Sequence, residues 1–352
     1  MRAYDLEVTG SLKISGDITA RSYVIQNTTT HMTTSFASGS TIFGDSGDDT
    51  HQFTGSLFIS GSRISFDDGK QNIAIGTNSI GVSGFTGNQN IAIGENAMLD
   101  ANGSNTGYNI VIGYNAGKSF GANNVYNTIL IGRQAGMNIN NGDASNTIAI
   151  GTNAGIDITS GQRNLLIGSE AGTNISTSDD NTAIGYNAMH GNDSTAGTGT
   201  GRNTGMGSSV LYAITTATGN TAIGYGAGDS ITTGGYNALL GYQAGQALVG
   251  GGTNIAIGYQ PLYLGTANSN AIAIGGRAGY NSQASYNVYV GYSAGRENRA
   301  GVSQVYIGNQ AGYYATGSYN TFVGFDAGKG GQTSAPFSSG PNNTAVGYQA
   351  LI

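Results

Sequence analysis

Carboxylates are the residues of this chain whose chemistry would be enzymatic. A protein that cleaves glycosidic bonds needs two carboxyl groups placed on opposite sides of the scissile bond. The candidates are few, namely Glu170, Asp179, Asp180, Asp193 and Glu297. Asp179 and Asp180 are adjacent within a turn-like segment, and adjacent residues of an extended strand point to opposite faces. We therefore expect no catalytic pair and interpret the chain as a non-enzymatic protein.

Metal-binding residues are equally sparse. The chain has no Cys, and its three histidines are His31, His51 and His190. None of them has a second His at ligand spacing. The densest polar cluster is Asp45, Asp48 and Asp49 beside His51, but a calcium site needs several oxygen ligands on one loop, and the spacing of an EF-hand is absent. Asp45, Asp48 and Asp49 are weak metal candidates, and we predict no bound metal and no cofactor.

Tyrosine is the residue type that could contact a receptor. The chain has 21 Tyr and no Trp. Seven of them directly follow a repeated Gly: Tyr114, Tyr186, Tyr225, Tyr242, Tyr259, Tyr292 and Tyr348. Stacked repeats would align them into a ladder that serves either as a platform for sugars or as packing between chains, and we favour packing. Two loops that lengthen the repeat, His190 to Arg202 and Lys329 to Pro341, are further candidates for receptor contact, with neutral surface bulges as the alternative.

These side chains are positioned by a repeat that covers most of the chain. The phrase Asn-x-Ala-Ile-Gly is clearest at 90–94, 181–185, 220–224 and 254–258. Its closing Gly, which we call the anchor Gly, recurs every 16 to 23 residues. The anchor glycines are Gly76, Gly94, Gly113, Gly132, Gly151, Gly168, Gly185, Gly207, Gly224, Gly241, Gly258, Gly275, Gly291, Gly308, Gly324 and Gly347. A fixed-period repeat of this length indicates a stacked, quasi-one-dimensional architecture.

Each repeat predicts one short strand and its turns. The residues before the anchor Gly alternate apolar, small and apolar, as in Ile91-Ala92-Ile93, which is the period of a strand. Gly, Asn, Ser and Thr fill the rest, as turns require. We predict an all-β fold, a β-solenoid or parallel β-roll of about sixteen rungs of 16 to 23 residues. The large β-branched residues are expected to fill the coil, and the Asn four residues before each anchor Gly to pair along the stack.

The small-residue face of these strands predicts an oligomer. If Ala92 and its equivalents faced outward, they would form an apolar stripe longer than a monomer tolerates. The simplest cover is a second and third copy of the chain. We therefore predict a parallel homotrimer.

The first seventy residues have a different pattern. Thr9-Gly10-Ser11-Leu12-Lys13-Ile14-Ser15-Gly16 recurs at 54–61 as Thr-Gly-Ser-Leu-Phe-Ile-Ser-Gly. We divide the chain into a β-rich N-terminal segment, 1–70, and a repetitive solenoid, 71–352. The N-terminal segment either attaches the protein to a partner or caps the open end of the stack, and the two roles are compatible.

Composition excludes several other classes. Of 352 residues 61 are Gly and 3 are Pro, and charged residues make up 9% against about 25% in an average protein. The net charge of −6 and the scattered Lys and Arg argue against nucleic-acid binding. No apolar run is long enough for a membrane span, and no apolar stretch of a secretory signal follows Met1.

The repeat resembles two known groups of proteins. Asn-Thr-Ala-Ile-Gly-Tyr-x-Ala, as at 181–188, is similar to the head repeats of trimeric autotransporter adhesins and even more to repeat arrays of bacteriophage tail fibres. The opening segment, 6–20, resembles segments of phage tail-fibre and other virion appendage proteins. The resemblance implies a homotrimeric fibre, each chain a left-handed β-roll, used for surface attachment. The period of 16 to 23 residues departs from the shorter, near-constant period of the adhesin heads. The absence of an export signal and of a membrane anchor favours a phage protein.

These observations lead to one expected function and two alternatives. We expect a structural fibre protein of a phage virion, made in the host cytoplasm, that forms a rigid trimeric shaft or head for host attachment. Its partners would be itself, other tail or baseplate proteins through residues 1–70, and a host cell-surface glycan or protein, with no nucleic acid and no membrane insertion. The alternatives are a trimeric adhesin on a bacterial surface and, more remotely, an ice-binding solenoid.

Overall fold

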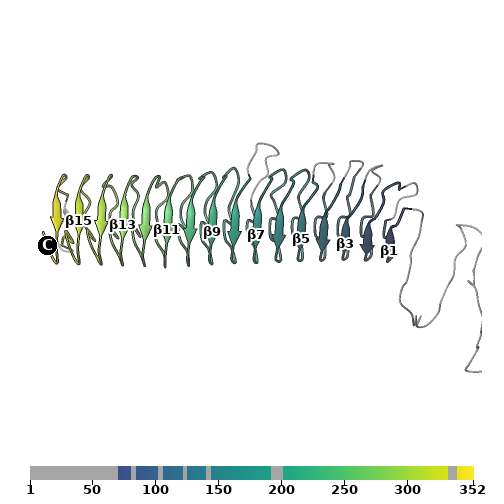
Figure 1. The fold of residues 1–352 in the computed structure, drawn as a ribbon, viewed down its shortest axis with the longest axis horizontal. Helices are drawn as coiled ribbons and strands as arrows, with labels where there is room; N and C mark the ends of the chain where they lie inside the picture. The colour runs from purple at the N-terminus through teal and green to yellow at the C-terminus, as the bar shows by residue number, and fades with distance from the viewer. Residues whose placement is uncertain are drawn as a thin grey trace, which may run out of the picture. The chain divides into compact units, whose positions relative to one another are not determined.

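The computed structural model describes residues 70–80, 85–101, 106–121, 125–139, 144–191, 201–331 and 339–352. They form a β-solenoid whose strands lie side by side in one row (Figure 1). The sixteen strands of this part of the chain are β1 (Ile73–Ile75), β2 (Ile91–Ile93), β3 (Ile110–Ile112), β4 (Ile129–Ile131), β5 (Ile148–Ile150), β6 (Leu165–Ile167), β7 (Thr182–Ile184), β8 (Thr204–Met206), β9 (Thr221–Ile223), β10 (Ala238–Leu240), β11 (Ile255–Ile257), β12 (Ile272–Ile274), β13 (Val288–Val290), β14 (Val305–Ile307), β15 (Thr321–Val323) and β16 (Thr344–Val346). The predicted all-β solenoid is confirmed there, while the predicted N-terminal segment, 1–70, lies outside the described residues except for Lys70.

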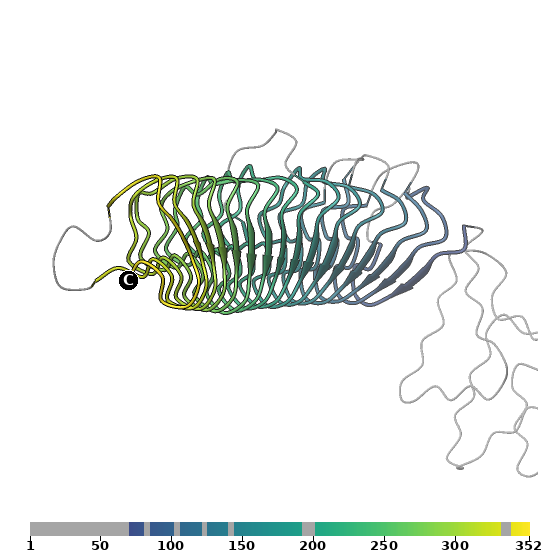
Figure 2. The same cartoon turned by 60° about the vertical axis from the view of Figure 1, so that its left-hand side comes forward.

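Equivalent positions of successive repeats stack directly on one another. Each strand pairs in parallel with the next, in the order β1 to β16, so that Ile73, Ala74 and Ile75 oppose Ile91, Ala92 and Ile93. Backbone hydrogen bonds also join the turns, for example from Gly117 N to Ala135 O over 2.9 Å. The strands form one wall of the coil, and non-strand segments close the rest of it (Figure 2). One strand and its return segment therefore make one rung.

The anchor Gly allows the rungs to approach closely at the corner after each strand. Its φ lies between 125° and 139° at all sixteen positions, a region that residues with a side chain rarely adopt. A Cβ at Gly76 would lie 2.7 Å from the carbonyl oxygen of Gly94 in the next rung. Both the backbone conformation and the rung spacing thus require Gly here.

The orientation of the strands is the reverse of the predicted one. The middle residue of each strand from β2 onward is buried, whether it is the small Ala92 or the larger Leu130 and Tyr306, all at 0% exposure. The flanking residues, such as Ile91 and Ile93, are only partly buried and face outward. The prediction that Ile fills the coil and Ala faces a partner is therefore wrong. The interior is filled instead by the middle residues and by residues of the opposite wall.

The interior is filled mainly from the opposite wall. The third residue after the anchor Gly is usually a buried Ala, and the seventh is often a buried large residue, such as Phe120, Ile139 or Ile158. Where the middle strand residue is aromatic, the opposite position is small or polar: Tyr289 faces Asn298 of its own rung, whose Nδ2 donates to the phenol oxygen over 2.6 Å. Tyr306 likewise has the small Ala315 at the seventh position, because an aromatic ring takes the space that a large residue of the opposite wall fills in other rungs.

The predicted Asn ladder is confirmed. The Oδ1 of Asn220 accepts from both the backbone N, over 3.0 Å, and Nδ2, over 2.9 Å, of Asn237 in the next rung. Asn237 repeats the same two bonds to Asn254. These side chains are almost fully buried, so the ladder satisfies polar groups that water does not reach. Thr128, Thr147, Ala271 and Gln304 interrupt it.

Candidate functional site

The outward face of the sheet is the most extended candidate surface. The third residue of every strand is apolar, from Ile75 in β1 to Val346 in β16, and most of the first residues are Ile, Leu or Val. We call these two columns the apolar stripe. Several of its members are well exposed, including Ile75 at 48%, Met206 at 41%, Ile223 at 38%, Leu240 at 47%, Ile257 at 37% and Ile307 at 40%. The stripe runs the full length of the sheet without a charged residue.

The size of the apolar stripe is unusual for a free surface. Sixteen rungs at about 4.8 Å extend over roughly 70 Å. Its side chains are more than a third exposed at several places, from Ile75 in β1 and Met206 in β8 to Val346 in β16, whereas the largest apolar patch on a typical monomer covers about 300–600 Å². A standard protein interface buries about 800 Å² on each partner. The stripe is thus large enough for an extended interface with another protein surface.

The tyrosines after the anchor Gly lie beside the apolar stripe and are all exposed. Tyr225, Tyr242 and Tyr259 stack with ring centroids 5.4 Å apart and interplanar angles of 15° and 8°. Rings in such a column cover each other's faces and present mainly their edges to solvent. The flat contact that a sugar makes with an aromatic face is therefore blocked for the middle ring, which favours the packing interpretation for this run.

The remaining four of these tyrosines do not continue the column. Tyr348 stacks on Phe325 with a centroid distance of 5.4 Å. Tyr114, Tyr186 and Tyr292 have no aromatic residue at the same position of either neighbouring rung. The sequence prediction of one ladder is met only at Tyr225, Tyr242 and Tyr259, because Ser, Gly, Asn, Glu or Arg occupies the position elsewhere.

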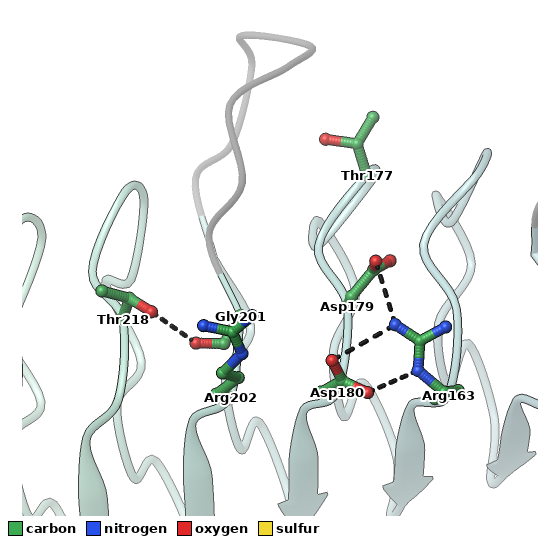
Figure 3. Close-up of a pocket in the computed structure, with 7 residues that line it drawn as sticks. All are labelled: Arg163, Thr177, Asp179, Asp180, Gly201, Arg202 and Thr218. Carbon is green, nitrogen blue, oxygen red and sulfur yellow. Dashed lines mark hydrogen bonds and ion pairs between the residues drawn. The ribbon is translucent and has the colours of Figure 1, made fainter.

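A small polar pocket includes Gly201 and Arg202, the described end of the first loop that lengthens the repeat (Figure 3). Its volume is about 150 Å³. The residues that line it are Arg163, Thr177, Asp179, Asp180, Gly201, Arg202 and Thr218. Arg163, Asp180 and Arg202 occupy the same position, five residues before the anchor Gly, in three successive rungs. Stacking thus creates a column of alternating charge.

Both adjacent carboxylates of this pocket face the same guanidinium. Arg163 Nε and Nη2 donate to the two carboxylate oxygens of Asp180 over 2.6 and 3.2 Å, and Nη2 lies 3.3 Å from Asp179 Oδ2 (Figure 3). Asp179 Oδ1 also accepts from the backbone N of Gln162 over 2.8 Å. The two side chains do not point apart as a strand geometry would have them, because neither Asp belongs to a strand.

The charge state of this pair does not suit acid catalysis. The hydrogen bond from Arg163 lowers the pKa of the Asp180 carboxyl below its ordinary value. A general acid in glycoside cleavage needs a raised pKa. Glu170 follows β6 and Glu297 follows β13, seven strands apart, and Asp193 lies outside the described residues. The candidate carboxylates that the structure describes are therefore not assembled into one site.

The metal candidates lie mostly outside the described residues. These are His31, His51, Asp45, Asp48 and Asp49. His190 stacks on Tyr212 with a centroid distance of 5.0 Å, and its Nε2 is 3.7 Å from Glu170 Oε2. Within the part of the chain that the structure describes, no three His, Asp or Glu side chains come together as a metal site, and no helix is long and apolar enough to cross a membrane.

The two candidate loops are only partly described. Residues 192–200 of the first and 332–338 of the second lie outside the described ranges. Sequence reasoning named both loops, but it missed the charged column beside the first and a row of aromatic and basic side chains beside the second. Both would be found by aligning the repeats on the anchor Gly and comparing the residues at each aligned position for charge and for aromatic rings.

Searches against family models, curated proteins and solved structures find no match to this chain. Its class therefore follows from the architecture alone. The chain is an all-β repeat protein of the β-solenoid type.

Proposed function

We propose that this protein is a structural fibre component of a phage virion, a parallel homotrimer that forms a rigid shaft or head for host attachment. The apolar stripe is the observation that carries the proposal. It is uncharged and large, and its third-residue column is apolar in all sixteen strands although these side chains do not fill the chain's own core. A second surface that covers the stripe accounts for that regularity.

A copy of the same chain fits the stripe best. Parallel copies share the same rung spacing, so that a contact made at one rung recurs at every rung. The two columns of the stripe differ, because the first residues include Thr182, Thr204, Thr221 and Ala238 whereas the third residues are all large and apolar. Unlike columns suit a closed ring in which one column of each chain packs against the other column of the next, as in a threefold arrangement.

The rung architecture suits a mechanical role. Hydrogen bonds between rungs run parallel to the stack in the strands, in the turns and in the buried Asn ladder. Such a stack lengthens by repetition, without a change of fold. The pairing of Asp179 and Asp180 with Arg163, and the separation of Glu170 from Glu297, give no support to a catalytic role. Attachment to other tail or baseplate proteins is assigned to residues 1–70.

Labelled antibodies against the purified chain would test the assignment to a virion. Electron micrographs of phage particles should show the label on tail fibres or another appendage. Label on the surface of uninfected bacteria, with none on particles, would contradict the proposal and favour the adhesin. The test does not depend on the oligomeric state, which is measured separately.

A further inference from the structure

A column of aromatic and basic side chains runs along the last part of the solenoid. The fifth residue after the anchor Gly is Tyr263, Tyr280, Arg296, Tyr313 and Lys329 in five successive rungs. Tyr263 and Tyr280 stack with centroids 4.9 Å apart. The guanidinium of Arg296 lies 5.4 Å from the ring centroids of both Tyr280 and Tyr313, and its Nη1 donates to the Tyr313 hydroxyl. Neighbours therefore cover one another's faces as far as Tyr313.

The column ends at Lys329, where a pocket opens. The Lys329 ammonium lies 3.2 Å from Oδ1 of Asp326 in its own rung. A surface pocket of about 360 Å³ is lined by Gln310, Tyr313, Tyr314, Lys329 and Gly330. It is bordered by two tyrosines of one rung and by two residues of the next, so it lies between stacked rungs.

The aromatic part of this pocket is a corner made by two rings. The rings of Tyr313 and Tyr314 have centroids 4.3 Å apart and planes inclined at 56°. Tyr313 is only 8% exposed and is held by Arg296, whereas Tyr314 is partly exposed. Tyr314 N donates to Lys329 O over 2.9 Å, which fixes the two rungs that border the pocket. The corner is thus preformed on stacked backbone rather than on a free loop.

The chemistry of this pocket fits a neutral sugar ring. Tyrosine rings contact the apolar C–H face of a pyranose, while the amide of Gln310 and the ammonium of Lys329 can bond its hydroxyls. Asp326 balances the charge of Lys329, so the pocket does not favour an anionic group. The exposed Tyr225, Tyr242 and Tyr259 form a nearly parallel stack rather than a corner, and both faces of the middle ring are covered.

We propose that the Tyr313–Tyr314 pocket binds one neutral pyranose residue of a host surface glycan. This inference rests on the proposed attachment function and names the ligand class and the place where it binds. Tyr314 supplies the exposed wall, Tyr313 the floor, and Gln310 and Lys329 the polar contacts.

Saturation-transfer NMR with the full chain and the methyl pyranosides of glucose, galactose and mannose tests the inference. We expect saturation transfer to at least one of these probes. Tyr314→Ala should weaken its binding by roughly tenfold, as loss of an aromatic wall implies. Tyr314→Phe keeps the ring and should retain binding, and so should Tyr236→Ala, which removes an exposed Tyr at a distant rung.

Two results would overturn the pocket assignment. One is the absence of saturation transfer to all three probes with the wild-type chain, and the other is equal transfer with Tyr314→Ala. Circular dichroism of each variant confirms that the solenoid is intact. If no sugar binds at the pocket but antibodies label virions, the fibre function stands and only the pocket assignment is refuted. If a sugar binds but antibodies do not label virions, the fibre function is refuted.

Discussion

The inner and outer sides of the same sheet differ in how much the size of their side chains varies from strand to strand. On the inner side, the middle residue of a strand varies from Gly205 to Ala222, Leu166 and Tyr306. On the outer side, the third residue of every strand is large and apolar although it is partly or well exposed. The inner column varies in size, whereas the third-residue column of the outer side stays large and apolar. Packing against a second surface is our proposed reason for that constancy.

Adjacent residues of β9 provide the largest expected contrast between the two sides. Ala222→Lys would bury an ammonium with no partner, because Ala222 is fully buried inside the coil. We expect a loss of more than ~4 kcal/mol in the free energy of unfolding. Circular dichroism melting measures the loss, with Ile223→Lys as the outward control. If both variants melt like the wild type, the assignment of the two faces is incorrect.

The outer side is tested by charge in the apolar stripe. Ile223→Lys combined with Ile257→Lys should leave the circular dichroism spectrum unchanged and separate the chains of the proposed trimer, because ammonium groups buried at an interface without partners are costly. Sedimentation velocity measures the separation. Val249→Lys with Leu264→Lys is a matched control, since both residues are exposed, at 43% and 42%, and lie outside the strands. Dissociation by the control pair alone would place the interface elsewhere.

A change in the Asn ladder, beside the strands, is expected to lower the free energy of unfolding by less than a charge in the core does. Asn237→Ala removes the side-chain bonds to Asn220, Asn254 and Gly251 and leaves their polar groups buried. We expect a loss of about 1–3 kcal/mol in unfolding free energy, measured by chemical denaturation. The opposite change, Ala271→Asn, fills an interruption of the ladder and should stabilise the chain. No loss with Asn237→Ala would show that the ladder does not contribute to stability.

The two buried tyrosines of the interior are expected to make the stability of the fold decline at alkaline pH. Burial raises the pKa of Tyr289 and of Tyr306 above the ordinary value. Their folded-state pKa exceeds that of the unfolded chain, so their contribution is complete below about pH 10 and falls by about 1.4 kcal/mol per pH unit and per Tyr above it. Replacing both by Phe, the residue already present at Phe322, should flatten the decline measured by denaturation at several pH values. If the double variant loses stability with pH as steeply as the wild type, the decline is caused by groups other than these two tyrosines.

The sequence predicted the solenoid and its ladder but not the orientation of its strands. The recurrence of the anchor Gly and of Asn, as at 220–224 and 254–258, identified the rung because only Gly suits that corner and Asn pairs with itself. Orientation was misread because Ile255-Ala256-Ile257 is apolar on both faces and has no polar side to point outward. The pockets escaped prediction because Arg163 and Arg202, or Tyr314 and Lys329, meet only through stacking of residues 15 to 39 positions apart.

The mass of the chain in solution tests the central claim most directly. Light scattering coupled to size-exclusion chromatography should give about three times the chain mass of 35.7 kDa, because in the proposed trimer the apolar stripe of each copy is covered by its neighbours. A single species of 35.7 kDa that stays soluble would contradict the interpretation, since the stripe would then be exposed to water along its whole length.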